Sequence, residues 1–427
     1  MMQKEYKAYT LKSFRKIPQI QKLPEEILCH IEAVGQVYPF RVNNYVIDEL
    51  IDWDDVPNDP CFRMTFPQKG MLTESSYNEI ASVTGGNPDQ IKAKLKKIYP
   101  ELNPHPAGQL EKNVPYLEGN KFEGVQHKYR ETILVFPSQG QTCHAYCSFC
   151  FRWPQFVGID SLKFSLRGID TLIQYLHQHP EISDVLFTGG DPLVMKTKVL
   201  ANYIDAILDA DFPHLTTIRI GTKALSYWPY RFLTDTDADE LLRLFSKITK
   251  KKKHLAFMAN FNHPQELKTD AAQKAIIRVR ETGAEIRTQS PLLANINDKA
   301  QTWADMWVKQ VELGCIPYYM FIARDTGAQH YFGVPLVKAW DIFRGAYQNI
   351  SGLARTVRGP IMSTTYGKVQ VLGINEIEGK KALVMQFLQA RNPLWVLQPF
   401  LADYDASAIW LDELRPLGKE NFFFESN

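Results

Sequence analysis

The stretch Cys143–Phe156 reads CHAYCSFCFRWPQF and places three of the chain's six cysteines within eight residues. Cys143, Cys147 and Cys150 follow a C-x3-C-x2-C spacing. A structural zinc site needs a fourth ligand, and His144 is too close to Cys143 in sequence to close a tetrahedron. The sequence also lacks a second C-x-x-C pair. Three thiolates instead suit a [4Fe–4S] cluster in which one iron has no protein ligand.

The bulk composition is that of an ordinary folded protein. The 427 residues are 45% hydrophobic and 22% charged, so the chain can bury a large core without disulfides. Its net charge of +2 gives no general attraction for nucleic acid or anionic membranes. We find neither a secretory signal nor a run long enough to span a membrane, and therefore expect a cytoplasmic protein. The single cysteines Cys29, Cys61 and Cys315 are expected to be small buried side chains.

Short apolar runs alternate with amphipathic segments after residue 129. The runs predict strands at residues 132–137, 183–190, 215–221, 254–260, 284–290 and 315–323. The segments between them predict helices near residues 161–178, 196–210, 236–250, 264–282, 299–313 and 336–350. Six such units predict an α/β fold with a parallel sheet, too few for an eight-fold barrel but enough for a partial (β/α)6 barrel. The cysteine stretch follows the first strand, where folds of this class place their sites.

The pattern divides the chain into three regions. Residues 1–120 predict a helical N-terminal region, with helices near residues 24–34, 73–83 and 87–98. Residues 121–352 contain the strand–helix units, and residues 353–427 predict a small C-terminal α+β extension. In that extension, residues 368–388 predict a β-hairpin with EGKK, residues 378–381, as its turn.

The cysteine spacing in a loop after the first strand resembles that of the radical S-adenosylmethionine (SAM) superfamily. The resemblance implies that the open iron binds the amino and carboxylate groups of SAM. Reduction of the cluster then breaks a carbon–sulfur bond of SAM, and the resulting 5′-deoxyadenosyl radical takes a hydrogen atom from substrate. The protein holds the cofactors, aligns the substrate carbon and excludes water. A reductant such as flavodoxin or ferredoxin is also implied.

Two later motifs agree with this resemblance. The sequence LFTGGDP, residues 186–192, ends the second predicted strand with two glycines that can adopt backbone angles closed to other residues. The second motif is the end of the fifth predicted strand. The residues expected to contact SAM are Gly189, Gly190, Asp191, Gln289 and Ser290, with Asp191 accepting a hydrogen bond from the SAM ammonium. The alternatives are a tight strand-to-helix turn at the glycines and turn capping at the fifth strand.

The resemblance sharpens to the lysine 2,3-aminomutase family and extends from about residue 59 to residue 379. Its markers, in order, include HKYRETILVF (127–136), CHAYCSFCFR (143–152), LFTGGDPL (186–193), IRIGTKA (218–224), TQSPLLANIND (288–298) and GPIMS (359–363). Membership would imply a SAM-dependent enzyme, usually with pyridoxal 5′-phosphate (PLP), that moves an α-amino group to the adjacent carbon of an amino acid. It would also imply a homo-oligomer.

One departure from the family concerns PLP. The family's Schiff-base lysine stands two residues before a proline, and here Arg358 occupies that position in TVRGPIMS, residues 356–363. A guanidinium stays protonated and cannot form the imine, so we expect covalent PLP binding to be lost. Lys368, ten residues on, matches a non-catalytic lysine of the family. Tyr129 matches a family tyrosine near the PLP ring, with simple packing as the alternative.

The residues at the family's substrate-binding positions also differ in this chain. Lysine-acting members bind the distal ammonium with two carboxylates, at positions where this chain has Arg324 and Arg355. Arginines reverse the local charge, so we expect an acidic or carboxylate-bearing small molecule, although a one-residue shift would restore Asp325. Arg152 matches the family arginine that grips the α-carboxylate, with a structural ion pair as the alternative. Together with Arg358, these arginines form the expected substrate-binding set.

These observations predict a radical SAM enzyme that abstracts hydrogen from an amino-acid-like or carboxylated substrate without covalent PLP. The outcome is an isomerisation, an elimination or another radical transformation, and the sequence does not choose among them. One alternative is a PLP-dependent amino acid 2,3-aminomutase that uses another lysine. A second alternative is a non-catalytic iron–sulfur protein that never cleaves SAM.

Overall fold

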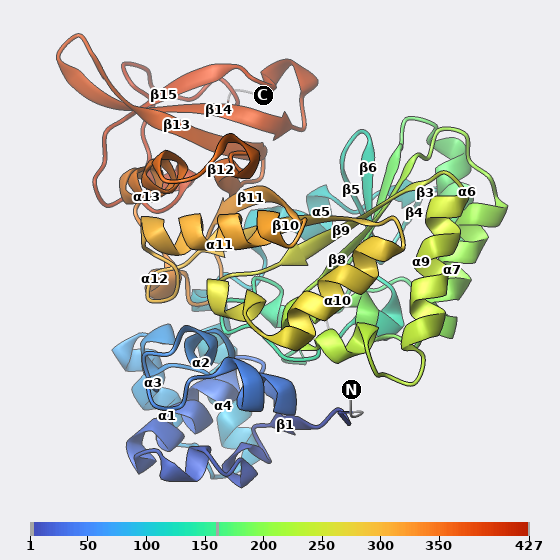
Figure 1. The fold of residues 1–427 in the computed structure, drawn as a ribbon. Helices are drawn as coiled ribbons and strands as arrows, with labels where there is room; N and C mark the ends of the chain where they lie inside the picture. The colour runs from blue at the N-terminus through green and yellow to red at the C-terminus, as the bar shows by residue number, and fades with distance from the viewer. Residues whose placement is uncertain (1–3, 159–161, 426–427) are drawn as a thin grey trace.

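The structure is a computed structural model that describes residues 4–158 and 162–425. Eleven strands form one sheet whose order follows the sequence from β5 to β15 (Figure 1). Neighbouring strands from β6 to β12 run parallel, and the sheet becomes antiparallel at both ends. The parallel strands are β6 (Thr132–Val135), β7 (Asp184–Phe187), β8 (Thr217–Thr222), β9 (His254–Asn260), β10 (Glu285–Leu292), β11 (Ile316–Ile322) and β12 (Arg358–Ser363).

The six strands predicted from sequence are confirmed as β6 to β11. The α/β class and the parallel sheet are therefore confirmed, while the predicted closure into a partial barrel is not. Within the described ranges, the outermost strands β5 (Val125–Tyr129) and β15 (Pro399–Asp403) each pair with one neighbour in this sheet. β12 is the parallel strand that the apolar pattern missed.

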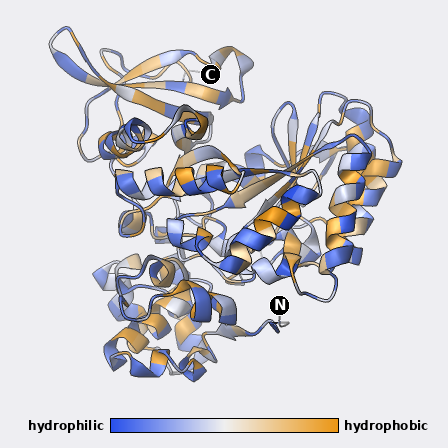
Figure 2. Cartoon of the chain, in the orientation of Figure 1, coloured by the Kyte–Doolittle hydropathy of each residue, from blue (hydrophilic) through white to orange (hydrophobic). Residues whose placement is uncertain are grey.

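A helix follows each predicted strand and covers the sheet with its apolar side. These helices are α6 (Asp170–Gln178), α7 (Thr197–Asp209), α9 (Ala238–Lys250), α10 (Asp270–Glu281), α11 (Ala300–Glu312) and α13 (Leu336–Gln348). Two short helices, α8 (Ala224–Tyr227) and α12 (Gln329–Phe332), follow β8 and β11. Figure 2 shows hydrophilic and hydrophobic residues mixed along the helices, as expected for elements with one buried side. No helix in the described part of the chain is both long and apolar enough to cross a membrane.

Two predicted helices are shorter than expected. The segment 161–178 becomes helical only at Asp170, because the backbone near Leu166 bridges to the end of β6; residue 161 lies outside the described residues. Leu166 N–H donates to Phe136 O at 2.7 Å, which uses a group that a longer helix would need. The segment 264–282 divides at Thr269, whose side chain caps α10 by accepting from a backbone N–H.

The N-terminal region contains the predicted helices with small shifts at their ends. Its helices are α1 (Glu25–Val37), α2 (Pro60–Thr65), α3 (Glu74–Ala81), α4 (Pro88–Glu101) and α5 (Gln109–Lys112), and its strand pairs are β1 (Ala8–Thr10) with β2 (Arg41–Asn43) and β3 (Tyr116–Leu117) with β4 (Asn120–Lys121). In Figure 1, α1 to α4 gather at the opposite end of the molecule from the C-terminal strands, whereas α5 lies beside the sheet. Most of its buried apolar residues belong to a second cluster, which also includes residues of the sheet region such as Trp153 and Trp228. The expected domain boundaries stay a prediction.

The C-terminal hairpin is confirmed with a tighter turn than predicted. β13 (Gly367–Ile377) and β14 (Lys380–Ala390) pair over their length, and Glu378 and Gly379 alone form the turn, with φ angles of 51° and 78°. Two residues with positive φ match the twist of the two strands, which is why the two lysines of EGKK belong to β14.

The isolated cysteines are partly as expected. Cys61 and Cys315 are buried, at 1% and 3% exposure. The prediction for Cys29 is wrong, because this thiol is exposed on α1. The buried face of α1 is formed by the larger side chains Leu28, Ile31 and Val34.

Candidate active site

A cavity of about 510 Å³ opens at the carboxyl ends of the parallel strands and contains most of the predicted site residues. Its lining includes Cys143, Cys147, Cys150, Arg152, Gly189, Gly190, Asp191, Gln289, Arg324 and Arg358. The structure therefore brings together residues that lie as much as 215 positions apart in sequence, counted from Cys143 to Arg358. Ser290 and Arg355 lie outside the lining, and Arg355 is exposed.

The cysteine loop, residues 143–152, has no regular secondary structure and is held by the N-terminal region. Tyr146 N–H donates to Arg41 O at 2.8 Å. Ser148 N–H donates to Met64 O at 2.8 Å. These bonds satisfy backbone groups that a strand or helix would otherwise pair, so the positions of the three thiols depend on residues far upstream.

The three thiols of the cysteine loop are free and partly buried. Burial raises the pKa of Cys147 to about 11 and of Cys150 to about 12, and it raises the pKa of Cys143 well above its usual value. Buried thiols of this kind ionise only when a strong positive charge, such as a metal ion, compensates the thiolate. Cys147 Sγ also lies 3.8 Å from the Tyr227 hydroxyl.

The donor set fits an iron–sulfur cluster better than a single ion. Among residues 4–158 and 162–425, no group of three or more His, Cys, Asp or Glu side chains is arranged to hold one metal ion. A cluster binds each cysteine through a different iron, so its ligands are spread more widely than those of zinc. Three thiols that line one cavity without converging on a point are compatible with that arrangement.

The glycine pair is required by close backbone approach. A Cβ on Gly190 would lie 2.3 Å from Thr142 O, and a Cβ on Gly189 would lie 2.2 Å from Gln141 Nε2. Gly189 also has a φ of 137°, which side chains rarely tolerate. The loop after β7 therefore packs directly on the residues that lead into the cysteine loop, and only glycine permits that contact.

Asp191 is buried, and its carboxylate is already used by neighbouring donors. It accepts from the Thr222 hydroxyl at 2.8 Å and from the backbone N–H groups of Lys223 and Leu193, each at 2.9 Å. Burial raises its pKa to about 6 despite these bonds. The contacts show a carboxylate that joins the loops after β7 and β8, and a direct bond to the ammonium of SAM stays a prediction.

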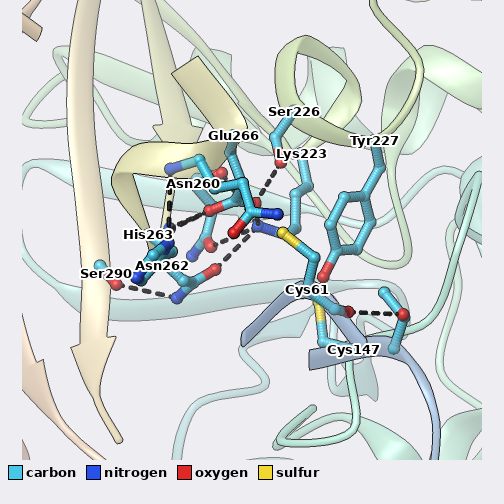
Figure 3. Close-up of polar contacts among 12 residues, drawn as sticks. Cys61, Cys147, Lys223, Ser226, Tyr227, Asn260, Asn262, His263, Glu266 and Ser290 are labelled. Carbon is cyan, nitrogen blue, oxygen red and sulfur yellow. Dashed lines mark hydrogen bonds and ion pairs between the residues drawn. The ribbon is translucent and has the colours of Figure 1, made fainter. Parts of the chain in front are cut away.

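A buried ion pair that the sequence analysis missed stands beside the cysteine loop (Figure 3). Lys223 Nζ, on the cavity lining, lies 2.6 Å from Glu266 Oε1 and 2.8 Å from Asn262 Oδ1. Glu266 is fully buried and also accepts from the Ser226 hydroxyl and from the backbone N–H of His263. The lysine follows β8 directly, so its place after a predicted strand could have identified it.

Of the two site residues predicted on β10, Gln289 reaches the cavity and Ser290 points into the protein interior. Gln289 lines the cavity. Ser290 is buried and accepts a hydrogen bond from Asn262 Nδ2 at 2.8 Å. Successive residues of a strand point to opposite faces, which explains why only one of the pair reaches the cavity. Ser290 instead supports the polar network around Lys223 and Glu266.

Arg152 is a partly buried cation with no acidic partner among residues 4–158 and 162–425. Its guanidinium carbon lies 4.5 Å from the ring centroid of Phe136 and 5.0 Å from that of Phe151. Its Nη1 is buried with no hydrogen-bond partner in the described structure. Burial lowers its pKa to about 10. A buried guanidinium with an unused donor is suited to bind a carboxylate that enters the cavity.

Arg324 and Arg358 line the part of the cavity formed by β11 and β12 and differ in their partners. Arg324 pairs with Asp325 at 3.4 Å, so its charge is compensated. Arg358 lies over two aromatic rings, with its guanidinium carbon 4.2 Å from the Tyr318 centroid and 4.4 Å from the Tyr319 centroid. Arg358 therefore leaves a positive charge facing the cavity.

Known proteins resemble this chain over most of its length. No protein-family model matches it. A candidate L-lysine 2,3-aminomutase of Aquifex aeolicus is 33% identical over 354 residues, which cover 83% of each chain. An L-lysine 2,3-aminomutase of Haemophilus influenzae is 27% identical over 351 residues, which cover 81% of this chain and 90% of that one.

Among solved structures, the radical SAM methyltransferase TsrM of Kitasatospora setae, with cobalamin and a [4Fe–4S] cluster bound, is 13% identical. The match covers 58% of this chain and 51% of that one, with a TM-score of 0.31. A likeness this weak supports no inference about fold or function.

The contact at Gly190 predicts that Gly190→Ala impairs assembly of the thiol site. The added Cβ must displace the backbone of Thr142, at a cost of roughly 1–3 kcal/mol, and the cysteine loop moves with it. Iron and sulfide per chain after anaerobic reconstitution should fall below the wild-type values. Gly168→Ala is the matched control, because its Cβ meets nothing within 4 Å. A full iron content in the Gly190 variant would show that the two loops need not touch.

The buried ion pair predicts that Glu266→Gln destabilises the fold by about 3–5 kcal/mol, because Lys223 is left charged without a counter-ion. Urea-induced unfolding, followed by tryptophan fluorescence, measures the change. The control is Asp205→Asn, which breaks the exposed pair with Lys247 and should cost no more than about 1 kcal/mol. Equal stability of the Glu266 variant and wild type would contradict the prediction.

Proposed function

This chain belongs to the lysine 2,3-aminomutase family of radical SAM proteins, and on that premise we propose that it cleaves SAM with a [4Fe–4S] cluster and abstracts hydrogen from an amino-acid-like or carboxylated substrate. The observation that carries the proposal is that three free thiols of one loop line the same cavity as the glycine-rich loop and Arg152, whose Nη1 is buried without a partner in the described structure. The parallel sheet around that cavity would correspond to the partial (β/α)6 barrel expected from sequence.

Each part of the lining has a role in this proposal. Cys143, Cys147 and Cys150 would hold the cluster, which together with SAM supplies a carbon-centred radical when both are bound. The glycine loop, Gly189 and Gly190, keeps backbone rather than side chains beside the cysteine loop and so leaves room for the methionine part of SAM. Gln289 and Asp191 supply polar groups on the same side, while Ser290 acts through its bond to Asn262.

The substrate would be placed by the cations of the cavity. Arg152 offers an unused donor for an α-carboxylate. Arg358 faces the cavity and has no acidic partner within the described ranges, whereas Arg324 is neutralised by Asp325. Arg355 is exposed, so it would act only on a group that reaches the outside of the cavity. An uncompensated positive lining favours an acidic substrate over free lysine.

Position 358, where the family resemblance places the lysine that binds PLP, is an arginine in this chain. Arg358 cannot form an imine, so we propose no covalent PLP at this residue. The alternative function, a PLP-dependent 2,3-aminomutase, requires a different lysine in the cavity. We further propose that a flavodoxin or ferredoxin supplies the electron, that the chain assembles as a homo-oligomer and that it works in the cytoplasm. The fate of the substrate radical, isomerisation or another transformation, follows from none of these contacts.

The thiol set predicts that anaerobically reconstituted protein, given SAM and dithionite, forms 5′-deoxyadenosine. Cys147→Ser should abolish both the cluster and this product, because a serine hydroxyl is a poor ligand for iron in such clusters. Cys315→Ser, a buried cysteine remote from the cysteine loop in sequence, should retain both. Spectroscopy and chromatography measure cluster and product. A four-iron cluster without SAM cleavage would favour the non-catalytic alternative, and zinc at the three thiols would refute the cluster.

The unpaired guanidinium predicts that Arg152 selects carboxylated substrates. Deuterated carboxylated metabolites, with glutamate and lysine among them, are screened for deuterium transfer into 5′-deoxyadenosine. Transfer should occur from an acidic compound and not from lysine. Arg152→Gln should lower kcat/KM for that compound by roughly ten- to a hundredfold, the loss of one charge-assisted contact. Arg344→Gln, at an exposed position, should leave it unchanged. Deuterium transfer from lysine alone would overturn the proposed substrate class.

A further inference from the structure

Two lysines of the cavity have no role in the proposed function. Lys128, on β5, and Lys368, on β13, both line the cavity although their strands lie at different ends of the sheet. Their hydrogen-bond acceptors in the described structure are neutral. Lys128 Nζ donates to the backbone oxygen of Thr364, and Lys368 Nζ donates to the side-chain oxygen of Gln389. Buried lysines without acidic partners are uncommon and call for an explanation.

The amine of Lys368 is placed between two aromatic rings. Its Nζ lies 4.9 Å from the ring centroid of Tyr319 and 5.3 Å from that of Tyr129. Arg358 contacts the same Tyr319 ring, with its guanidinium carbon 4.4 Å from the centroid. The amine of Lys368 and the guanidinium of Arg358 therefore lie in the same part of the cavity.

The surroundings keep both amines partly unprotonated at neutral pH. Burial, followed by repulsion from Arg219 and Arg358, lowers the pKa of Lys368 to about 7, and Asp184 opposes this only in part. Burial, followed by repulsion from Arg391, Arg324 and Lys368, lowers the pKa of Lys128 to about 7, against attraction by Asp325. An unprotonated lysine amine in a desolvated cavity is a nucleophile for carbonyl carbon.

We propose that Lys368 Nζ forms an imine with an aldehyde that carries an anionic group, and that Lys128 binds the anionic group. The amine nitrogen bonds to the carbonyl carbon, the carbon–oxygen bond breaks, and the oxygen leaves as water with the two hydrogens of the amine. The flat faces of Tyr129 and Tyr319 suit a conjugated aldehyde. The inference shares its cavity with the proposed function and revises it in one respect, since the amine lost at Arg358 would be supplied by Lys368.

The test uses PLP as the probe and reconstituted full-length protein under anaerobic conditions. After incubation the mixture is reduced with borohydride, digested, and the modified lysine is identified by mass spectrometry. We expect saturable, stoichiometric labelling at Lys368. Lys368→Arg keeps the charge but cannot form an imine, so it should lose this label. Lys381→Arg, at an exposed position of β14, should label as wild type does.

Two further measurements on folded protein separate a built site from adventitious labelling. Pyridoxal, which lacks the phosphate, should need a roughly tenfold higher concentration than PLP to label Lys368 in wild type. In Lys128→Met, PLP should need the same higher concentration, because the contact to its phosphate is lost. The labelling rate at Lys368 should rise with pH and level off above about 7. A lysine free in water has a pKa of about 10.4, so a solvated amine would continue to gain reactivity well above pH 7.

Labelling confined to exposed lysines, or equal labelling of wild type and Lys368→Arg, would overturn the inference. A rate at Lys368 that follows the ordinary lysine profile would also contradict it, because the amine would then be solvated. Formation of 5′-deoxyadenosine without any added aldehyde is measured separately. A protein that cleaves SAM but never labels at Lys368 would refute the imine alone, and one that labels but never cleaves SAM would refute the proposed function alone.

Discussion

The cavity depends on hydrogen bonds between the cysteine loop and the N-terminal region. The loop belongs to no strand or helix, so its backbone groups must be satisfied elsewhere, and Arg41 and Met64 accept two of its N–H groups. The carbonyl of His144 accepts from the Tyr6 hydroxyl at 2.7 Å. The parallel sheet supplies the floor of the site, but the N-terminal helices and strands fix the thiols above it. This explains why a helical region without any motif of its own accompanies the sheet.

Charge is distributed unevenly along the cavity. Near the cysteine loop, Lys223 is neutralised by Glu266, and the buried carboxylate of Asp191 is satisfied by three donors. Toward β11, β12 and β13, the cations Lys128, Arg358 and Lys368 form no ion pair with an acidic side chain in the part of the chain that the structure describes. Such an imbalance is costly unless a bound anion removes it. These cations, to which Arg152 of the cysteine loop adds, therefore favour negative charge in the cavity.

The sequence was sufficient for features that are local and insufficient for those that depend on register. The strands β6 to β11 are short apolar runs, and the cysteine spacing lies within ten residues, so both were predictable. Whether Gln289 or Ser290 reaches the cavity depends on which face of β10 is turned toward it. The apolar content of the strand does not reveal that face. Lys223 and Glu266 come from loops after β8 and β9, and only the folded sheet shows that they meet. The exposure of Cys29 depends on which side of α1 packs against the rest of its region.

Arg358 and Lys368 lie on neighbouring strands and contact the same aromatic ring. Arg358 stands beside Tyr319 in the parallel pairing of β11 with β12, and Lys368 reaches the same ring from the antiparallel neighbour β13. From the family resemblance alone, we expect a guanidinium in place of an amine at residue 358 and therefore no imine there. The sheet brings a second amine to the same ring from ten residues downstream, where burial and two arginines keep it partly unprotonated. On the proposal made for Lys368, β13 would supply from the neighbouring strand the amine that β12 lacks.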